Sequence, residues 1–106
     1  MAATVSSVIV SPLPGGTVLV SGLATLSANY QAAGETMDLS SYLTGSPIIV
    51  MSGDDGYVPQ SDRGTAAANT IQLYEAGADA AALDEVANGT NVAAVICTFH
   101  AHGLSV

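Results

Sequence analysis

Apolar and polar residues alternate along two long stretches of the chain, and a period of two is typical of a strand that buries one face. The first stretch covers residues 17–30, with Gly22 in its middle, where we expect a bulge or a bend. Its inward series is Val18, Val20, Ala24, Leu26, Ala28 and Tyr30. The second stretch covers residues 92–102, with Ala93, Val95, Cys97, Phe99 and Ala101 on one face and Ala94, Ile96, Thr98, His100 and His102 on the other.

Shorter segments also predict strands. Residues 36–39 and 70–74 alternate, and the apolar run 47–51 is typical of a strand buried on both faces. Residues 40–43 favour one helical turn, capped by the first of them or by Asp38. The inward residues of the two alternating segments are Met37, Leu39, Ile71 and Leu73. Short strands separated by turns predict an all-β domain, either a small sandwich or a jelly-roll-like barrel.

Three segments between the strands carry turn or helix signals. We expect turns at 52–56 and 62–64, where glycine accompanies aspartate. Residues 76–89 are ambiguous: helix formers before Asn88 and Gly89 favour a short helix, and a loop that ends in a strand at 83–87 fits equally well.

The first sixteen residues differ from the rest of the chain. They carry no charged side chain, and Pro12, Pro14 and two glycines separate them from the alternating stretch. We therefore expect an extended N-terminal arm at 1–16 and a single β domain at 17–106. Since an apolar arm has little reason to stay exposed, we predict that it pairs with a sheet edge of an adjacent subunit. The predicted interface residues are Val8, Ile9, Val10 and Leu13.

The charge balance limits the possible partners. Nine acidic residues face one basic residue, Arg63, and the net charge is −8. Such a chain repels phosphate backbones and anionic lipids, so we expect neither nucleic acid nor a membrane among its partners. With 49% apolar and only 9% charged residues, a monomer would expose apolar patches, which predicts self-association. No basic leader or long apolar run is evident, so we expect the chain to be made in the cytoplasm.

Candidate chemistry is sparse. His100 and His102 share one strand face and could supply half of a zinc site, but no Cys, Asp or Glu lies within two residues of them. We expect a surface or subunit-facing strand end there, and no metal. The pair Asp54 and Asp55 favours a solvated turn over a calcium loop. The lone Cys97 favours a small buried apolar residue.

Motifs for catalysis are also missing from the sequence. It has no Gly-x-Ser-x-Gly elbow and no lysine for a phosphate-binding loop. Acidic residues close together in the sequence fall in expected turns and loops, so we interpret them as solvated charge; they are Glu35, Asp38, Asp84 and Glu85. We therefore expect no enzyme, no catalytic residue and no cofactor.

A family resemblance follows from the order of several segments. The segment 30–40, YQAAGETMDLS, resembles one found in small structural proteins of tailed bacteriophages. Later landmarks are GYV at 56–58, IQLY at 71–74, EVANGTNV at 85–92 and VICTFHAHG at 95–103. Across residues 17–103 the chain is similar to head-decoration, or capsid cement, proteins. The resemblance implies a β-sandwich that forms a homotrimer on the capsid exterior and binds the major capsid protein.

We therefore expect a virion structural protein that decorates and stabilises a bacteriophage capsid through subunit and shell contacts. The alternative is a β-sandwich binding module for carbohydrate or surface adhesion, displayed on a virion or a cell. Sugar-binding domains usually offer an aromatic platform, whereas this chain has no Trp, one Phe and four dispersed Tyr.

Overall fold

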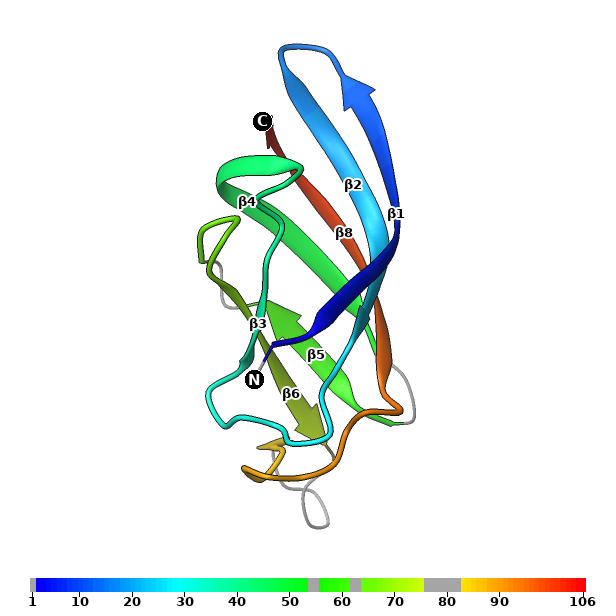
Figure 1. Cartoon of the computed structure of the whole chain (residues 1–106), viewed down its shortest axis with the longest axis vertical. Helices are drawn as coiled ribbons and strands as arrows, with labels where there is room; N and C mark the ends of the chain where they lie inside the picture. Colours follow the sequence, from blue (N-terminus) through cyan, green and yellow to red (C-terminus); the bar gives the residue numbers. More distant parts are fainter. Residues whose placement is uncertain (1, 54–55, 62–63, 76–82) are drawn as a thin grey trace.

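The computed structural model describes residues 2–53, 56–61, 64–75 and 83–106, and these residues form an all-β sandwich of two antiparallel sheets (Figure 1). The first sheet has the order β1-β2-β8-β4, and the second has the order β3-β6-β5, with β7 paired to β6. The fold class expected from the alternation is confirmed. The strands are β1 (Thr4–Leu13), β2 (Thr17–Thr25), β3 (Glu35–Met37), β4 (Leu43–Ser52), β5 (Val58–Ser61), β6 (Asn69–Glu75), β7 (Asp84–Glu85) and β8 (Ile96–Ser105).

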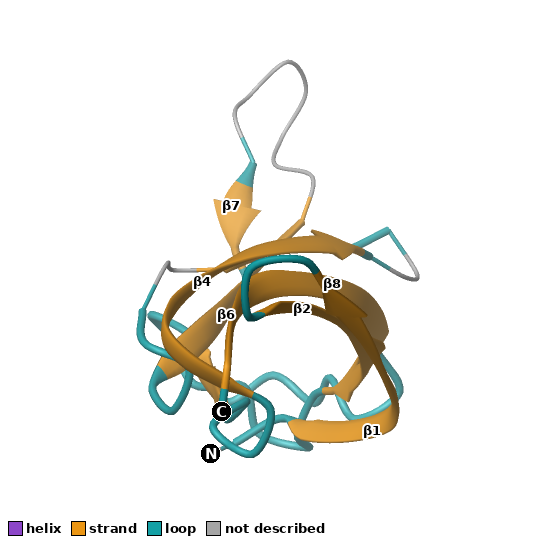
Figure 2. Cartoon of the chain, turned by 90° about the horizontal axis from the view of Figure 1, so that it is seen from above, coloured by secondary structure: helices purple, strands orange, loops and turns teal. Residues whose placement is uncertain are grey.

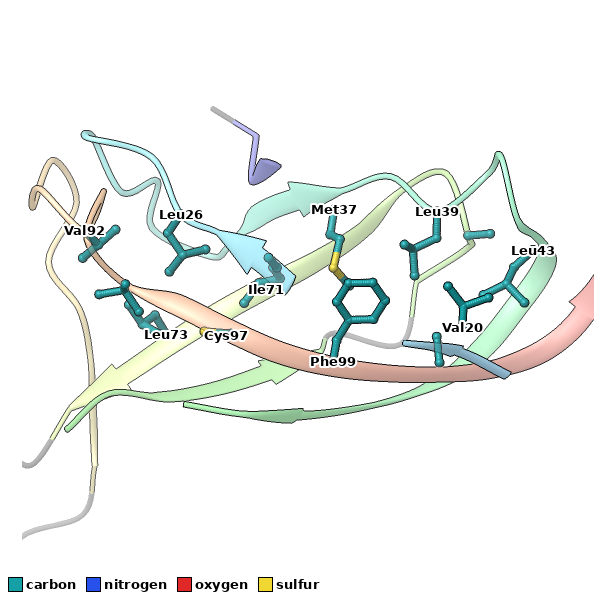
Figure 3. Packing of buried hydrophobic residues seen from close by; sticks show 14 of the residues in the cluster. Val20, Leu26, Met37, Leu39, Leu43, Ile71, Leu73, Val92, Cys97 and Phe99 are labelled. Atoms are coloured by element: carbon teal, nitrogen blue, oxygen red, sulfur yellow. The ribbon is translucent and has the colours of Figure 1, made fainter. Parts of the chain in front are cut away.

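The core lies between the two sheets. Because side chains alternate along each strand, β2 and β8 send every second residue inward. Phe99 on β8 lies at the centre, with the sulfur of Met37 from β3 beside its ring (Figure 3). The predicted inward residues that are buried are Val18, Val20, Ala24, Leu26, Tyr30, Met37, Leu39, Ile71, Leu73, Val95, Cys97, Phe99 and Ala101. Ala28 and Ala93, which were expected on the same faces, are exposed.

The N-terminal segment is part of the first sheet. Residues 4–13, expected to belong to a separate arm, pair antiparallel with β2 of the same chain, and Pro14, Gly15 and Gly16 form the hairpin turn. Pro12 is accommodated because β1 is the sheet's edge strand. The register of β1 shifts between Ser6 and Ile9, opposite Gly22. The irregularity expected at Gly22 therefore lies in its partner strand.

Five other segments differ from expectation or lie outside the description. The last strand begins at Ile96, because residues 92–95 form a turn in which Val95 N donates to Val92 O. The run 47–51 is buried on one face only, and Ile48 and Val50 are exposed. The turns at 54–55 and 62–63, and residues 76–82 of the ambiguous segment, lie outside the described residues.

The two sides of the sandwich are not equivalent. On one side the chain start joins the sheets, since Ala3 N donates to Thr36 O and Ala2 forms a bridge with Thr36. On the other side β4 pairs with β8 only and β5 pairs with β6 only. The strongly curved first sheet seen from above in Figure 2 therefore has two edge strands, β1 and β4.

Candidate functional site

The outer face of the first sheet is the most unusual surface of the described chain. Its four strands contain no Asp, Glu, Lys or Arg, although the protein has a net charge of −8. Directly opposed residues point to the same face, and the strand registers therefore define rows across this surface. The four rows are Ser6–Leu23–Thr98–Ser52, Ile9–Ser21–His100–Val50, Ser11–Leu19–His102–Ile48 and Leu13–Thr17–Leu104–Thr44. We call these rows the neutral face.

Large aliphatic side chains on the neutral face are open to solvent. Ile9 and Ile48 are each 65% exposed, Val50 is 63% exposed and Leu104 is 58% exposed. Single exposed aliphatics are ordinary, but a contiguous group on an uncharged sheet marks a contact surface. The apolar run 47–51 adds to this, since its composition is typical of a strand that is covered on both sides.

Two histidines lie in the middle of the neutral face. His100 shares a hydrogen bond with Ser21 of β2, with 3.0 Å between Nδ1 and Oγ. His102 lies one row further along, between Leu19 and Ile48. Among the described residues, no group of three or more His, Cys, Asp or Glu could hold a metal ion. The pair is part of the neutral face, and the described residues do not complete a metal site around it.

The predicted interface residues lie on or beside this surface. Ile9 and Leu13 belong to its rows, and Val10 is also exposed. Val8 differs, because it is half-buried and packs against the core. The structure thus presents three of the four side chains to solvent from an edge strand.

A groove of about 500 Å³ runs along the other edge of the same sheet. One wall is β4, from Pro47 to Met51, and the other is β5, from Pro59 to Ser61. Because five consecutive residues of β4 line it, residues of both faces contribute, so the groove follows the edge of the strand. None of the lining residues is charged or aromatic.

Two carboxylates that we expected from the sequence to be solvated instead make hydrogen bonds within the fold. Glu35 is fully buried and accepts hydrogen bonds from Ser27, at 3.0 Å from the backbone N and 2.7 Å from Oγ. Glu85 accepts from Tyr30 Oη and from Ala33 N, each at 2.8 Å. Both carboxylates hold the loop between β2 and β3 in place. A period of two from Met37 and Leu39 points back to Glu35, which was the available signal for its burial.

These contacts shift two pKa values. Burial raises the pKa of Tyr30 to about 12, and the neighbouring Glu85 adds to this while the Leu73 N–H opposes it. Hydrogen bonds from Ser40, the side chain first and the backbone second, lower the pKa of Asp38. Asp38 Oδ1 lies 2.9 Å from Ser40 N, at the start of the predicted turn, where Leu43 N donates to Leu39 O.

Comparisons of this chain with protein-family models, curated sequences and solved structures found no match. Within the part of the chain that the structure describes, no helix is long and apolar enough to span a membrane.

Proposed function

We propose that the chain is a virion structural protein that decorates and stabilises a bacteriophage capsid from the outside. The observation that carries the proposal is the separation of charge from contact surface: the neutral face has exposed aliphatics, and none of the nine acidic residues belongs to its four strands. The resemblance of residues 17–103 to head-decoration proteins points in the same direction. In this proposal the major capsid protein contacts the neutral face.

The physical basis is selective binding to the assembled shell. A protein that binds only the assembled state shifts the equilibrium toward it by mass action. Apolar side chains such as Ile48, Val50 and Leu104 gain free energy when the shell covers them, at about 25 cal/mol per Å² removed from water. Acidic side chains on the remaining surface keep decorated particles apart by repulsion.

We further propose that copies of the chain associate with one another, with three copies as the number that the resemblance implies. The exposed edge strand β1, with Ile9, Val10 and Leu13, is available for such a contact. Light scattering at micromolar concentration gives the mass, and a stable monomer contradicts the self-association.

The binding-module alternative has no support of its own in the structure. The groove beside β4 offers backbone and aliphatic walls without an aromatic platform for a sugar ring. A glycan array separates the two functions, because specific binding of a sugar by the isolated chain would favour the alternative.

The direct test adds the purified chain to undecorated heads of the phage that encodes it. We expect saturable co-sedimentation and a rise in the temperature at which the heads disrupt. Heads that neither retain the chain nor gain heat resistance contradict the proposal. Bovine serum albumin, another acidic protein, is the control for non-specific co-sedimentation.

A further inference from the structure

The two edges of the first sheet are unprotected. β1 and β4 are each ten residues long, and neither contains a charged side chain. Exposed edge strands normally carry charges or are covered, because their free N–H and C=O groups pair readily with another strand. Prolines and register shifts interrupt the edges of β1 and β4, and Gly45 O of β4 accepts a hydrogen bond from Ala66 N, but residues 48–52 of β4 have none of these features.

The directions of these strands decide how they can meet. Every neighbouring pair in the order β1-β2-β8-β4 is antiparallel, so β1 and β4 run in opposite directions. A second copy related by rotation about an axis along the strands keeps its strand directions. Its β1 therefore meets β4 of the first copy as an antiparallel pair, which is the more stable type of ladder.

We infer that β4 of one copy pairs with β1 of a second copy, so that the sheet continues from subunit to subunit. The contact is head-to-tail, and such contacts close into a ring when the rotation allows it. A closed ring leaves neither edge unpaired. A two-fold β4–β4 contact would leave the β1 edges of both copies exposed, which is why we assign the mixed pair.

The groove beside β4 fits this occupant. It follows the strand edge at Pro47–Met51 and carries no charge, and β1 is equally uncharged. Val10 of β1 points to the inner side of the sheet, as its opposite Val20 does, yet Val10 is 44% exposed. In the proposed pair, Val10 of the second copy enters the groove, and Ile9 of that copy continues the outer surface next to Val50 or Ile48.

This contact deepens the proposed function by identifying the strand edges through which copies associate, and it leaves the neutral face, on the outer side of the sheet, for the shell. The copies then present one continuous neutral sheet. The two claims remain separable, because decoration of heads and strand pairing between copies are measured independently.

Disulfide cross-linking tests the pairing. Opposed residues in antiparallel strands have Cβ atoms about 4.5–5.5 Å apart, which suits a disulfide. We would make Ile9→Cys/Val50→Cys, together with each single variant as a matched control. Within one chain these two positions are three strands apart in the same row, about 14 Å, so an internal bridge is excluded. The native Cys97 is buried and does not compete.

We expect covalent multimers from the double variant under mild oxidation and none from either single variant. Ile9→Cys with Ile48→Cys or Ser52→Cys covers registers shifted by two residues. All of these positions are exposed, so the core is untouched, and reduced samples should match the parent in circular dichroism and mass. Cross-linking of a single variant, which reports pairing of like edges, overturns the inference. Failure of all three double variants, or a monomeric parent, also overturns it. If that parent still decorates heads, the proposed function stands without this contact.

Discussion

Replacing Tyr30 by Phe tests the link that holds the end of the sandwich together. The ring is fully buried, and its hydroxyl donates to Glu85 Oε2 at 2.8 Å and accepts from Leu73 N at 2.9 Å. Phe keeps the ring and removes only the oxygen. The variant therefore leaves the buried Leu73 N–H without its partner and Glu85 without one donor.

The magnitude follows from these two contacts. A buried donor left unpaired costs about 1–3 kcal/mol, and a hydrogen bond to a charged group contributes about 1.5–3 kcal/mol. Since the two losses share one oxygen and partly overlap, we expect the free energy of unfolding to fall by about 2–4 kcal/mol. For a domain of this size, the melting temperature should fall by roughly 10–20 °C.

Urea unfolding followed by circular dichroism, at matched protein concentrations, measures the difference. Tyr74→Phe is the control, because Tyr74 is half-buried and its hydroxyl donates to Oε1 of Gln72 on the same strand, at 3.1 Å. We expect that control to change stability by less than about 0.5 kcal/mol. A Tyr30→Phe variant as stable as the control would refute the assignment of the Tyr30 hydroxyl.

Alkaline pH gives a second arm of the same experiment. The pKa of Tyr30 is raised from 10.0 to about 12 in the folded chain. The stability that its hydroxyl contributes is therefore fully present below pH 10 and is lost as pH rises through 12. Phe cannot ionise. The stability gap between the parent and Tyr30→Phe should therefore narrow between pH 10 and 12, and a constant gap contradicts the pKa assignment.

Two further substitutions probe the packing. Gly22→Ala places a Cβ 3.0 Å from Phe99 Cζ and from Ser6 O. We therefore expect the free energy of unfolding, measured in urea, to fall by about 1–3 kcal/mol. An unchanged urea midpoint would show that β1 moves to make room for the methyl group. Glu35→Gln puts an amide N–H₂ where a carboxylate oxygen accepts from Ser27. We expect the free energy of unfolding to fall by about 1–3 kcal/mol in the same assay. An unchanged free energy of unfolding would mean that Glu35 is solvated.

The alternation of residues predicts much of this fold because a period of two is a local property of a strand. It places Val20, Phe99 and Leu73 in the core, as found. It cannot reveal the contact between Tyr30 and Glu85, which are 55 residues apart and meet only after both sheets form. Pairing of β1 with β2 was missed for a different reason: Pro14 and the two glycines that suggested an arm form a hairpin turn, which ends one strand and begins the next.

The run 47–51 shows how far the sequence alone can predict the candidate site. Apolar composition indicates which side chains can be covered, and it does not say whether the same chain covers them. Ile48 and Val50 fit a strand buried on both faces, and in a single chain one face is open. The neutral face therefore became visible only when the strand registers aligned four separate segments.

The central claim is that the neutral face is the surface that contacts the capsid. Thr98 lies exposed on β8 within this face, between Leu23 of β2 and Ser52 of β4, away from both sheet edges. Thr98→Asp introduces an unpaired carboxylate there, and Thr98→Asn introduces a neutral side chain of the same shape. The most direct measurement is the affinity of these two variants for undecorated heads. We predict that Asp weakens binding at least about tenfold relative to Asn, with both variants equally stable; equal affinities would show that the shell is contacted through another surface.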